Sequence, residues 1–490
     1  MKQKHFLAFD LGASSGRAIL GTLDREILSL TEIHRFTNQM QLIRGHYFWN
    51  IFSLFNELKS GLQKCIKDHG IQPLSVSVDT WGVDFVHLDK TGMILSLPFA
   101  YRDSRTNTAM EDLFRIVPRK EVYRQTGIQF MQFNTLFQLY SMVREENPLV
   151  KITDRILFMP DALNYLFSGV AATEFSIAST SQMIIPGRCA WQKGLLQAVG
   201  IPDQFLGKII LPGTKIGVLT KDIAEETGSL QIPVIAVAGH DTASAVAAVP
   251  AENANFAYIS SGTWSIFGIE NPEPIISDKT EIMNFTNEGG VEGTTRFLKN
   301  IMGMWLIQEC RRIWTGKVTY TWDEMVGMAK KSRPFKFLID PDDSGFLNPG
   351  DMPGAIDRYC ERTGQGKPAS HAEIVRCIYD SLALKYRYTL DQIRSVSSRP
   401  IEKIHIIGGG ANNLFLNQLT ANVTGIPVVA GPAEATATGN MLMQARAMGM
   451  IASLGEMRQM VRKSFDLVTF TPEPVMDGDD VYERFCKMVQ

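Results

Sequence analysis

Residues 6–20 read FLAFDLGASSGRAIL, and residues 256–269 read FAYISSGTWSIFGI. Each stretch has an apolar run, a short turn rich in serine and glycine, and a second apolar run, a pattern that predicts a β-hairpin. Their first residues, 6 and 256, lie about half a chain length apart. This spacing indicates a duplicated fold with equivalent hairpins facing each other across a cleft. On this pattern alone, a chance coincidence of two Ser/Gly hairpins stays an equal alternative.

Apolar runs typical of strands alternate with helical periodicity along the rest of the chain. In residues 374–396, for example, Ile374, Ile378 and Leu382 fall near one face of a helix. This alternation predicts α/β layers. We expect strands at Phe6–Phe9, Ala18–Leu20, Leu74–Val78, Phe85–Leu88, Val234–Ala238, Phe256–Ile259, Ser265–Ile269, Ile404–Ile407 and Val428–Ala430. We expect helices at Phe52–Asp68, Ile374–Val396, Leu414–Val423 and Glu434–Met448.

The length of 490 residues is too great for one ordinary hydrophobic core and predicts two large domains. Hydrophobic residues make up 45% and charged residues 20%, which is typical of a globular chain. Pro250 and polar residues follow an apolar segment near Val249–Asn253. We place the boundary there and predict domains at residues 1–249 and 250–490.

The net charge of −2 leaves no basic excess for a nucleic-acid backbone or an anionic membrane, so a small molecule is the expected partner. Only Phe6 to Phe9 form an apolar run before Asp10, which is too short for a secretory signal. No apolar run approaches the length of a membrane helix. We therefore expect a cytoplasmic protein, either a monomer or a homodimer.

The six cysteines are scattered and form no C-x-x-C pair, which argues against a zinc site. Buried free thiols are the favoured interpretation. Cys360 and Cys377 lie 17 residues apart across a turn-rich stretch. A disulfide between them stays open, although a reducing cytosol disfavours it.

The turn of the first hairpin, Asp10 to Arg17 (DLGASSGR), combines the donors that a phosphate group needs. Its glycines let the backbone approach a bulky anion, and its N–H groups, two hydroxyls and one guanidinium can donate to phosphate oxygens. Asp10 stands at a strand end, where a carboxylate can hold Mg²⁺ through water. An ordinary polar turn is the alternative, and the density of donors favours phosphate. The chain has no G-x-x-x-x-G-K-[ST] sequence, so this turn is not a P-loop.

Two more turns indicate nucleotide contact. Ser260 to Ser265 (SSGTWS) forms the turn of the second hairpin and could hold the terminal phosphates from the other side. Gly408, Gly409 and Gly410 follow an apolar strand and precede a helix, which leaves a surface without side chains for adenine or ribose. A polar turn and a tight strand-to-helix turn are the respective alternatives.

Gly239 to Ser244 (GHDTAS) follows the predicted strand Val234–Ala238. A kinase needs a carboxylate near the acceptor hydroxyl to orient it and take its proton, and Asp241 suits that role. The flanking His240 and Thr242 could hydrogen-bond a polyol. From the motif alone, Asp241 as a helix N-cap is the slightly favoured alternative.

The stretch 75–85 (SVSVDTWGVDF) places Asp79 and Asp84 on either side of Trp81-Gly82. Sugar sites combine carboxylates and main-chain groups with an aromatic surface. Residues 101–105 (YRDSR) add hydrogen-bonding groups. A solvated turn with one half-buried tryptophan is the alternative.

Together these segments resemble the FGGY carbohydrate kinases of the actin-like ATPase superfamily, from Phe6 to about Phe470. GGGANN (408–413) and AGPAEATATGN (430–440) are similar to the C-terminal nucleotide segments of that family. Several stretches look most like the family members that act on L-rhamnulose: DTWGVDFV (79–86), YRDSRTN (101–107), GIQFMQFNTLFQL (127–139), GHDTASAV (239–246), SSGTWS (260–265), TNEGG (286–290) and LKNIMGMWLIQ (298–308).

The resemblance implies an α/β fold of two actin-like (ribonuclease-H-like) domains with a deep interdomain cleft, and ATP and Mg²⁺ as cofactors. It also implies roles position by position. ATP would contact Ala13, Ser14, Ser15, Gly16, Arg17, Thr263, Gln308 and Gly409. The sugar would contact Gly82, His240, Asp241, Thr242 and Asn300. Asp241 becomes the proton acceptor, which reverses the preference from the motif alone.

The implied activity is ATP-dependent phosphorylation of L-rhamnulose at its 1-hydroxyl. A kinase of the same fold for L-fuculose, xylulose, glycerol or another small polyol is one alternative. A non-metabolic actin-like ATPase switch is the other, although such a switch needs no sugar-binding stretch.

Overall fold

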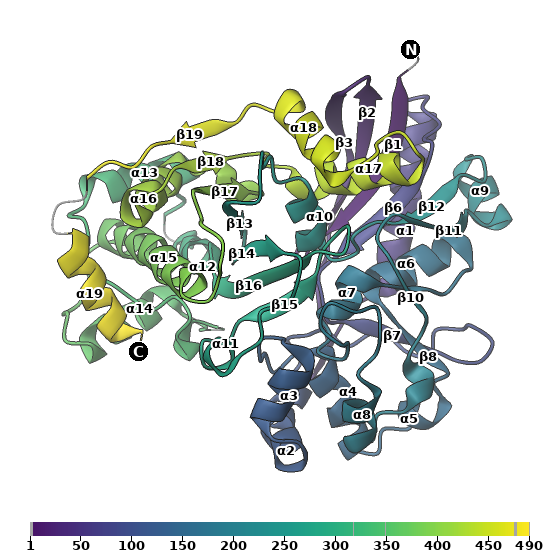
Figure 1. The fold of residues 1–490 in the computed structure, drawn as a ribbon, viewed down its shortest axis with the longest axis horizontal. Helices are drawn as coiled ribbons and strands as arrows, with labels where there is room; N and C mark the ends of the chain where they lie inside the picture. The colour runs from purple at the N-terminus through teal and green to yellow at the C-terminus, as the bar shows by residue number, and fades with distance from the viewer. Residues whose placement is uncertain (1–2, 317, 348, 475–477, 490) are drawn as a thin grey trace. The chain divides into compact units, whose positions relative to one another are not determined.

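The computed structural model describes residues 3–316, 318–347, 349–474 and 478–489. The chain forms two compact units (Figure 1). The first comprises Met1–Glu252, Glu270–Phe297 and Ala435–Phe465, and the second Asn253–Ile269, Leu298–Glu434 and Asp466–Gln490. Each unit is therefore built from three segments that are distant in sequence. The domain boundary predicted after residue 249 stays a prediction.

The first unit contains a six-stranded sheet in the order β11-β12-β6-β1-β2-β3. The neighbours β1–β2 and β2–β3 are antiparallel, whereas β6 is parallel to β1 and to β12. At the other edge, β11 is antiparallel to β12, so the parallel pairs lie in the middle of a mixed sheet. Its strands are β1 (Lys4–Leu11), β2 (Ser15–Asp24), β3 (Ile27–Thr37), β6 (Val76–Thr80), β11 (Thr214–Val218) and β12 (Pro233–Ala236).

Helices of the first unit bury apolar stripes against this sheet. In α1 (Ile51–Lys67), the buried residues recur at helical spacing, and the side chain of Asn50 caps the helix by accepting from Ser53 N–H at 3.0 Å. Figure 1 shows α17 beside β1 and α10. The other helices near the sheet are α6 (Met159–Ser168), α9 (Lys221–Thr227), α10 (Asp241–Ala247), α17 (Ala435–Ala447) and α18 (Leu454–Ser464).

A second hydrophobic cluster of the first unit, which includes Phe137, Phe158 and Phe205, lies among shorter elements. These are β7 (Phe85–Leu88), β8 (Arg155–Phe158), α2 (Ala109–Ile116), α3 (Arg119–Thr126), α4 (Thr135–Arg144), α5 (Leu149–Ile152), α7 (Phe175–Ser179) and α8 (Lys193–Ala198). The remaining elements of this unit are β4 (Gln41–Ile43), β5 (His46–Phe48), β9 (Thr173–Glu174), β10 (Ile209–Ile210), α11 (Asp278–Ile282) and β15 (Thr286–Gly289).

The strands of the second unit follow the order β16-β14-β13-β17-β18-β19. β13 is antiparallel to β14 and parallel to β17, which is parallel to β18. The strands are β13 (Phe256–Ser261), β14 (Trp264–Asn271), β16 (Thr295–Met302), β17 (Lys403–Ile407), β18 (Val428–Ala430) and β19 (Val468–Phe470). The helices are α12 (Trp305–Trp314), α13 (Trp322–Lys331), α14 (Met352–Arg362), α15 (His371–Arg394), α16 (Leu414–Thr424) and α19 (Gly478–Met488).

The two sheets repeat one connection. Each has an antiparallel hairpin, β1–β2 or β13–β14, whose first strand pairs in parallel with a later strand, β6 or β17. The two hairpins predicted from the sequence are therefore confirmed, and their equivalence is a property of the fold. All nine predicted strands and all four predicted helices overlap an observed element of the same type.

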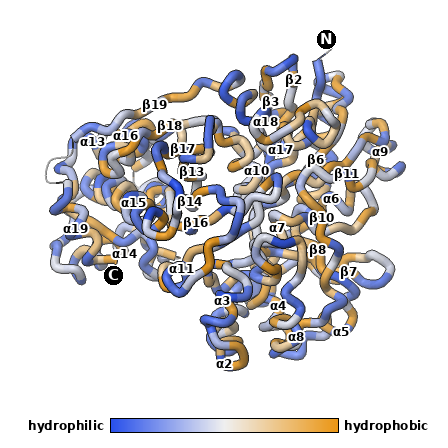
Figure 2. Tube along the Cα trace, in the orientation of Figure 1, coloured by the Kyte–Doolittle hydropathy of each residue, from blue (hydrophilic) through white to orange (hydrophobic). Residues whose placement is uncertain are grey.

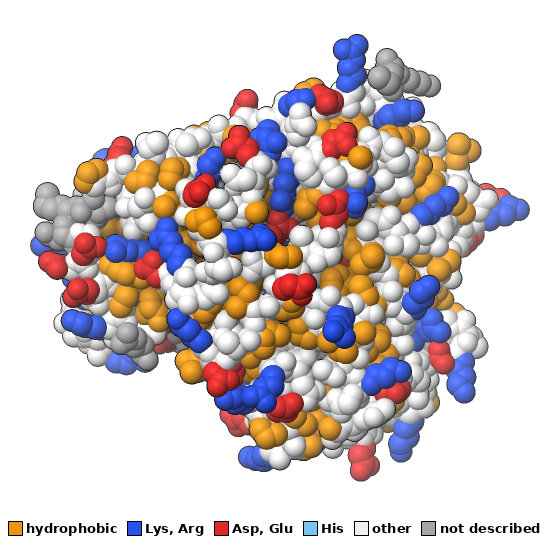
Figure 3. Space-filling view, viewed as in Figure 1, with side chains coloured by type: hydrophobic (Ala, Val, Ile, Leu, Met, Phe, Trp, Pro, Cys, Tyr) orange, Lys and Arg blue, Asp and Glu red, His pale blue; other side chains and the backbone are white. Residues whose placement is uncertain are grey.

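Along the described chain in Figure 2, hydrophobic stretches are short and are interrupted by hydrophilic residues. Among the residues that the structure describes, no helix combines the length and the apolar character needed to cross a membrane. On the face drawn in Figure 3, acidic and basic side chains are interspersed.

Candidate active site

The turn of the first hairpin is exposed and braced. Gly12 N–H donates to Ser15 O at 2.9 Å and closes the turn. Asn38, just after β3, donates from its backbone N–H to Ser14 O at 3.0 Å and from Nδ2 to Gly12 O at 2.9 Å. Ala13 and Ser14 are exposed, and Ser15 is half-buried. The loop therefore offers a fixed, accessible backbone, as the predicted phosphate contact requires.

Packing gives a second reason for glycine at position 16, besides the predicted approach of ATP. A Cβ at this buried position would lie 2.2 Å from the ring of Phe36 on β3. The aromatic ring thus occupies the space that any side chain at residue 16 would need. Packing within the sheet is sufficient to require glycine here, and contact of Gly16 with ATP stays a prediction.

Asp10 and Arg17 form an ion pair across the hairpin, where the antiparallel register sets them opposite each other. Arg17 Nη2 donates to Asp10 Oδ2 at 2.5 Å, and the two side chains are 19% and 11% exposed. The cation predicted to bind ATP and the carboxylate predicted to hold Mg²⁺ therefore neutralise each other here.

Asp79 lies beside Asp10 because β1 and β6 pair in parallel with these residues in register. The Asp79 side chain is fully buried and accepts a hydrogen bond at Oδ2 from Asn440 Nδ2 at 2.6 Å. Its Oδ1 is buried without a hydrogen-bond partner among the described residues. Burial and the nearby charge of Asp10 raise the pKa of Asp79 well above its ordinary value, against the effect of Asn440.

These carboxylates fit a hydrated magnesium ion. A cation would relieve the repulsion between Asp10 and Asp79 and would give the buried Oδ1 of Asp79 a counter-charge. Among the described parts of the chain, no three His, Cys, Asp or Glu side chains form a ready-made ligand set.

Asp241 is the first residue of α10, and His240 occupies the N-cap position. The Asp241 carboxylate accepts at Oδ1 from the Thr242 N–H at 2.5 Å and from Thr242 Oγ1 at 3.1 Å. The N-cap alternative is therefore wrong for Asp241. Its side chain keeps 30% of its surface exposed. Enclosure by the protein raises its pKa, His240 opposes this shift, and Asp10 adds to it.

The backbone before Asp241 is held by residues that the sequence did not single out. Glu174 Oε2 accepts from Gly239 N–H at 2.9 Å, and Ser176 Oγ accepts from His240 N–H at 3.3 Å. Glu174 also caps α7 by accepting from the N–H groups of Ser176 and Ile177. The only sequence signal was an acidic residue at a helix start, which is common at any helix.

Gly82 begins a strained loop. A Cβ on Gly82 would lie 3.1 Å from Thr180 Oγ1, and Val83 has a φ of +67°, which is rare for a β-branched residue. Thr180 Oγ1 accepts from Val83 N–H at 3.2 Å, and Thr135 Oγ1 donates to Val83 O at 2.6 Å. The surrounding threonines therefore impose the backbone shape at the predicted sugar contact.

Asp84 anchors this loop from inside. The carboxylate is 1% exposed and accepts at Oδ2 from Trp49 Nε1 at 2.7 Å and Trp81 Nε1 at 3.0 Å, and at Oδ1 from Gln138 Nε2 at 3.0 Å. Burial raises its pKa to about 6 in spite of these donors. Asp84 and the buried Trp81 therefore support the loop and offer no open face to a sugar.

In the second unit, the turn of the second hairpin is exposed at Gly262 and Thr263. Thr263 Oγ1 lies 3.5 Å from Gln308 Oε1, so the structure brings together two residues predicted to contact ATP. The start of α12 braces the turn, because Met304 N–H donates to Gly262 O at 3.0 Å and Trp305 N–H to Thr263 O at 3.2 Å.

The three glycines 408–410 have different roles. Gly408 has a φ of +79°, and a Cβ on Gly410 would lie 2.0 Å from Ser261 Oγ. Only Gly409 is exposed with open space around its missing Cβ. Turn geometry and packing on the hairpin therefore explain Gly408 and Gly410. Gly409 alone is free to face a ligand, as predicted for ATP.

Asn300, the remaining predicted sugar contact, is half-buried in β16 of the second unit. Its neighbour Lys299 is enclosed, and burial followed by the charge of Lys385 lowers the pKa of Lys299 to about 8. Asp342 accepts from Met302 N–H at 2.9 Å and pairs with Lys385 at 3.0 Å. The end of β16 is thus anchored by a half-buried carboxylate paired with a buried lysine.

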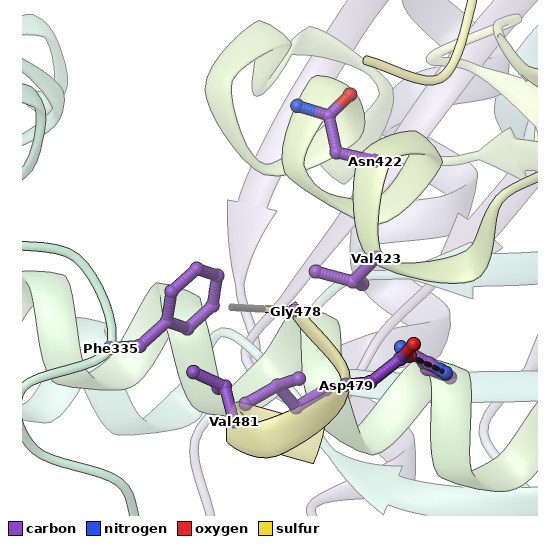
Figure 4. Close-up of a pocket in the computed structure, with 8 residues that line it drawn as sticks. Phe335, Asn422, Val423, Gly478, Asp479 and Val481 are labelled. Carbon is purple, nitrogen blue, oxygen red and sulfur yellow. Dashed lines mark hydrogen bonds and ion pairs between the residues drawn. The ribbon is translucent and has the colours of Figure 1, made fainter. Parts of the chain in front are cut away.

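The candidate residues divide between the units. The first unit contains Asp10, Ala13 to Arg17, Gly82 and His240 to Thr242. The second unit contains Thr263, Asn300, Gln308 and Gly409. A cavity of about 190 Å³ near α19, lined by Phe335, Asn422 and Asp479 among others, contains none of these candidate residues (Figure 4).

Cys360 and Cys377 are both buried free thiols, so the structure contains no disulfide between them.

Comparison with known proteins identifies two family domains in succession. The N-terminal domain of the FGGY family of carbohydrate kinases matches residues 5–248, and the C-terminal domain of that family matches residues 257–448.

Relatives and solved structures agree with these matches. The chain is 49% identical to a rhamnulokinase from Bacteroides thetaiotaomicron, over 100% of each chain, and 42% identical to one from Bacillus subtilis, over 99% of this chain and 98% of that one. Its fold is similar to a xylulose kinase from Lactobacillus acidophilus (TM-score 0.79, 14% identity, 99% and 96% coverage). It is also similar to a glycerol kinase from Plasmodium falciparum (TM-score 0.80, 14% identity, 99% and 97% coverage). The chain therefore belongs to the FGGY family of carbohydrate kinases, with two α/β domains of actin-like fold.

Proposed function

We propose that this carbohydrate kinase transfers the γ-phosphoryl group of ATP to the 1-hydroxyl of L-rhamnulose, giving L-rhamnulose 1-phosphate and ADP. Membership of a kinase family implies ATP as the donor. The observation that carries the choice of sugar is full-length identity of 49% and 42% to two proteins named rhamnulokinase. The proposed enzyme acts in the cytoplasm as a monomer or homodimer.

Asp241 is the proposed proton acceptor. Its Oδ1 is engaged by Thr242, and 30% of the side chain remains exposed, so the carboxylate is both oriented and accessible. It would orient the 1-hydroxyl for in-line attack on the γ-phosphorus and take its proton. Thr242, Gly82 and Asn300 would hold the other hydroxyl groups of the sugar, while His240 would line the site beside Asp241.

The two hairpin turns are the proposed contacts for phosphate groups. Ala13 to Arg17 supply backbone N–H groups, hydroxyls and a guanidinium, and Thr263, Gln308 and Gly409 supply the remaining ATP contacts. Asp10 would hold Mg²⁺ through water, with Asp79 behind it, and the bound ion would neutralise phosphate charge. Arg17 would then exchange part of its ion pair with Asp10 for phosphate oxygens.

The alternative sugars make a direct test possible. Purified protein with MgATP is assayed for ADP release with L-rhamnulose, L-fuculose, D-xylulose and glycerol. We expect the highest kcat/KM with L-rhamnulose. A higher value with another acceptor would reassign the substrate, and ATP hydrolysis that no sugar stimulates would favour an ATPase switch.

A further inference from the structure

Arg296 is a permanent cation with no exposed surface in the first unit. A buried cation is costly unless it is paired and hydrogen-bonded. Arg296 Nη2 donates to Glu288 Oε2 at 3.0 Å, and Arg296 Nε donates to Gly289 O at 3.0 Å. Neither Arg296 nor Glu288 belongs to the residues proposed above for ATP, sugar or magnesium.

This pair ends on the histidine that precedes the proposed base. Arg296 Nη2 and Glu288 Oε2 each lie 3.3 Å from His240 Nδ1. On the other side of the ring, His240 Nε2 faces Asp241 Oδ1 at 3.4 Å. Arg296, His240 and Asp241 thus form one continuous line of polar contacts, with Glu288 as the counter-charge at its inner end.

The contacts at His240 Nδ1 allow two assignments, because Arg296 Nη2 and Glu288 Oε2 both lie 3.3 Å from it. A guanidinium Nη atom carries two N–H groups, so Arg296 Nη2 can donate to Glu288 and to His240 Nδ1 at the same time. A neutral imidazole whose Nδ1 accepts must carry its proton on Nε2. That N–H faces the Asp241 carboxylate.

We infer that Arg296 and Glu288 are positioning residues for phosphoryl transfer, which hold His240 with its Nε2–H directed at Asp241 Oδ1. Oδ1 then receives donors from His240 and Thr242, so Oδ2 is left to take the proton of the substrate hydroxyl. This inference rests on the proposed role of Asp241 as the base.

The surroundings support a fixed arrangement. Gly289 N–H donates to Ser179 Oγ at 2.7 Å, which ties β15 to α7, and Ser176 of the same helix accepts from His240 N–H. Burial alone would raise the pKa of Glu288, but the charge of Arg296 holds it below its ordinary value. Glu288 therefore stays a carboxylate at neutral pH.

The groups that act on the Asp241 carboxylate are His240, Asp10 and Asp79, while Arg296 and Glu288 act on His240. Asp10 and Asp79 disfavour the ionised base, and His240 is the donor that favours it. Without Arg296, the imidazole proton would move from Nε2 to Nδ1, where it can be donated to Glu288. The lone pair of Nε2 would then face Asp241. The proton acceptor would then be less readily ionised and less well oriented.

The test is Arg296→Met, measured with L-rhamnulose and MgATP. We expect kcat to fall about 10- to 100-fold, as for other partners that orient a functional histidine. KM for ATP should stay within about twofold, and the acid limb of kcat/KM should move to higher pH. Arg296→Lys keeps the cation but replaces the guanidinium fork by a single ammonium, so it should recover part of kcat.

The matched control is Arg376→Met in the second unit. Arg376 is 9% exposed and donates to the buried Asp380 at 2.8 Å, so its loss also leaves a buried carboxylate without its cation. We expect this variant to lose stability and keep kcat. If Arg296→Met does not fold, the charge-neutral Arg296→Met/Glu288→Gln variant is measured in its place, with the same expectation for kcat.

A second readout needs no turnover. In ¹⁵N-histidine-labelled wild type, the ring nitrogens of His240 should show the Nε2–H tautomer, and the Arg296 variant should lose it. A His240 ring protonated at Nδ1 alone in the wild type, or a kcat loss in Arg296→Met no larger than in Arg376→Met, overturns the inference. Absence of L-rhamnulose phosphorylation by the wild type would instead overturn the proposed substrate and leave the NMR result to decide the positioning role.

Discussion

The substitution Gly439→Ala in α17 adds a single methyl group and should displace Asp241, the proposed base. A Cβ at residue 439 would lie 1.8 Å from the backbone O of Ser244 on α10, the helix that begins with Asp241. Contacts below 3.0 Å essentially never occur, so the two helices must separate by about 1.2 Å in Gly439→Ala. Because the obstacle is backbone, no side-chain rotation can relieve it.

The magnitudes follow from this geometry. Overpacking of a buried contact costs about 1–3 kcal/mol, whereas alanine gains about 1 kcal/mol over glycine in a helix interior. We expect a net loss of stability of up to about 2 kcal/mol. A shift on the order of 1 Å in a catalytic group can cost about 10²-fold in rate, so kcat should fall by at least about tenfold.

Gly327 provides the matched control. It lies within α13, and a Cβ there would meet no atom within 4 Å. Gly327→Ala should gain up to about 1 kcal/mol from helix propensity and keep full activity. Urea unfolding and kcat are measured for both variants. A Gly439→Ala protein that is as stable and as active as Gly327→Ala would refute the steric argument.

Three further results are expected. Because the folded pKa of Asp84 is about 6, against an ordinary value of 3.8, stability should fall by about 3 kcal/mol as pH rises from about 4 to 6. Urea midpoints against pH, followed by tryptophan fluorescence, should show this fall in the wild type. Asp84→Asn should show a smaller fall, because burial also raises the pKa of Asp380 to about 6, so Asp380 titrates over the same range. The raised pKa of Asp241 should place the acid limb of kcat/KM above pH 3.8, whereas a limb at or below that value would contradict the burial argument. Exposed Cys189 should react with a thiol reagent in the native state before the buried Cys360 and Cys377, as mass mapping of the labelled peptides can check.

Local patterns were enough to predict the framework. Apolar runs interrupted by Ser/Gly turns gave β1–β2 and β13–β14, because hairpin partners are close in sequence. The strands β3 and β16 were not predicted. Charged and polar residues interrupt both of them, as in TRFLKNIM of β16, so neither shows a continuous apolar run.

The contacts that hold the site residues in place could not be predicted from the sequence, because they join residues that are far apart in the chain. Glu174 reaches Gly239 across 65 residues, and Arg296 reaches His240 across 56. The sequence analysis explained the glycines by ligand approach alone. A Cβ at Gly16 would meet the ring of Phe36, and one at Gly410 would meet Ser261. Glycines in such turns therefore indicate close packing as well as ligand approach. The residues named for ATP and sugar contact stay predictions.

The most direct test of the central claim follows product formation by ³¹P NMR in wild type and Asp241→Asn, with MgATP and L-rhamnulose. We predict that the wild type forms L-rhamnulose 1-phosphate. The variant should bind ATP normally and turn over about 10²- to 10⁴-fold more slowly. A near-normal rate in the variant, or a phosphate at another hydroxyl, would contradict the account.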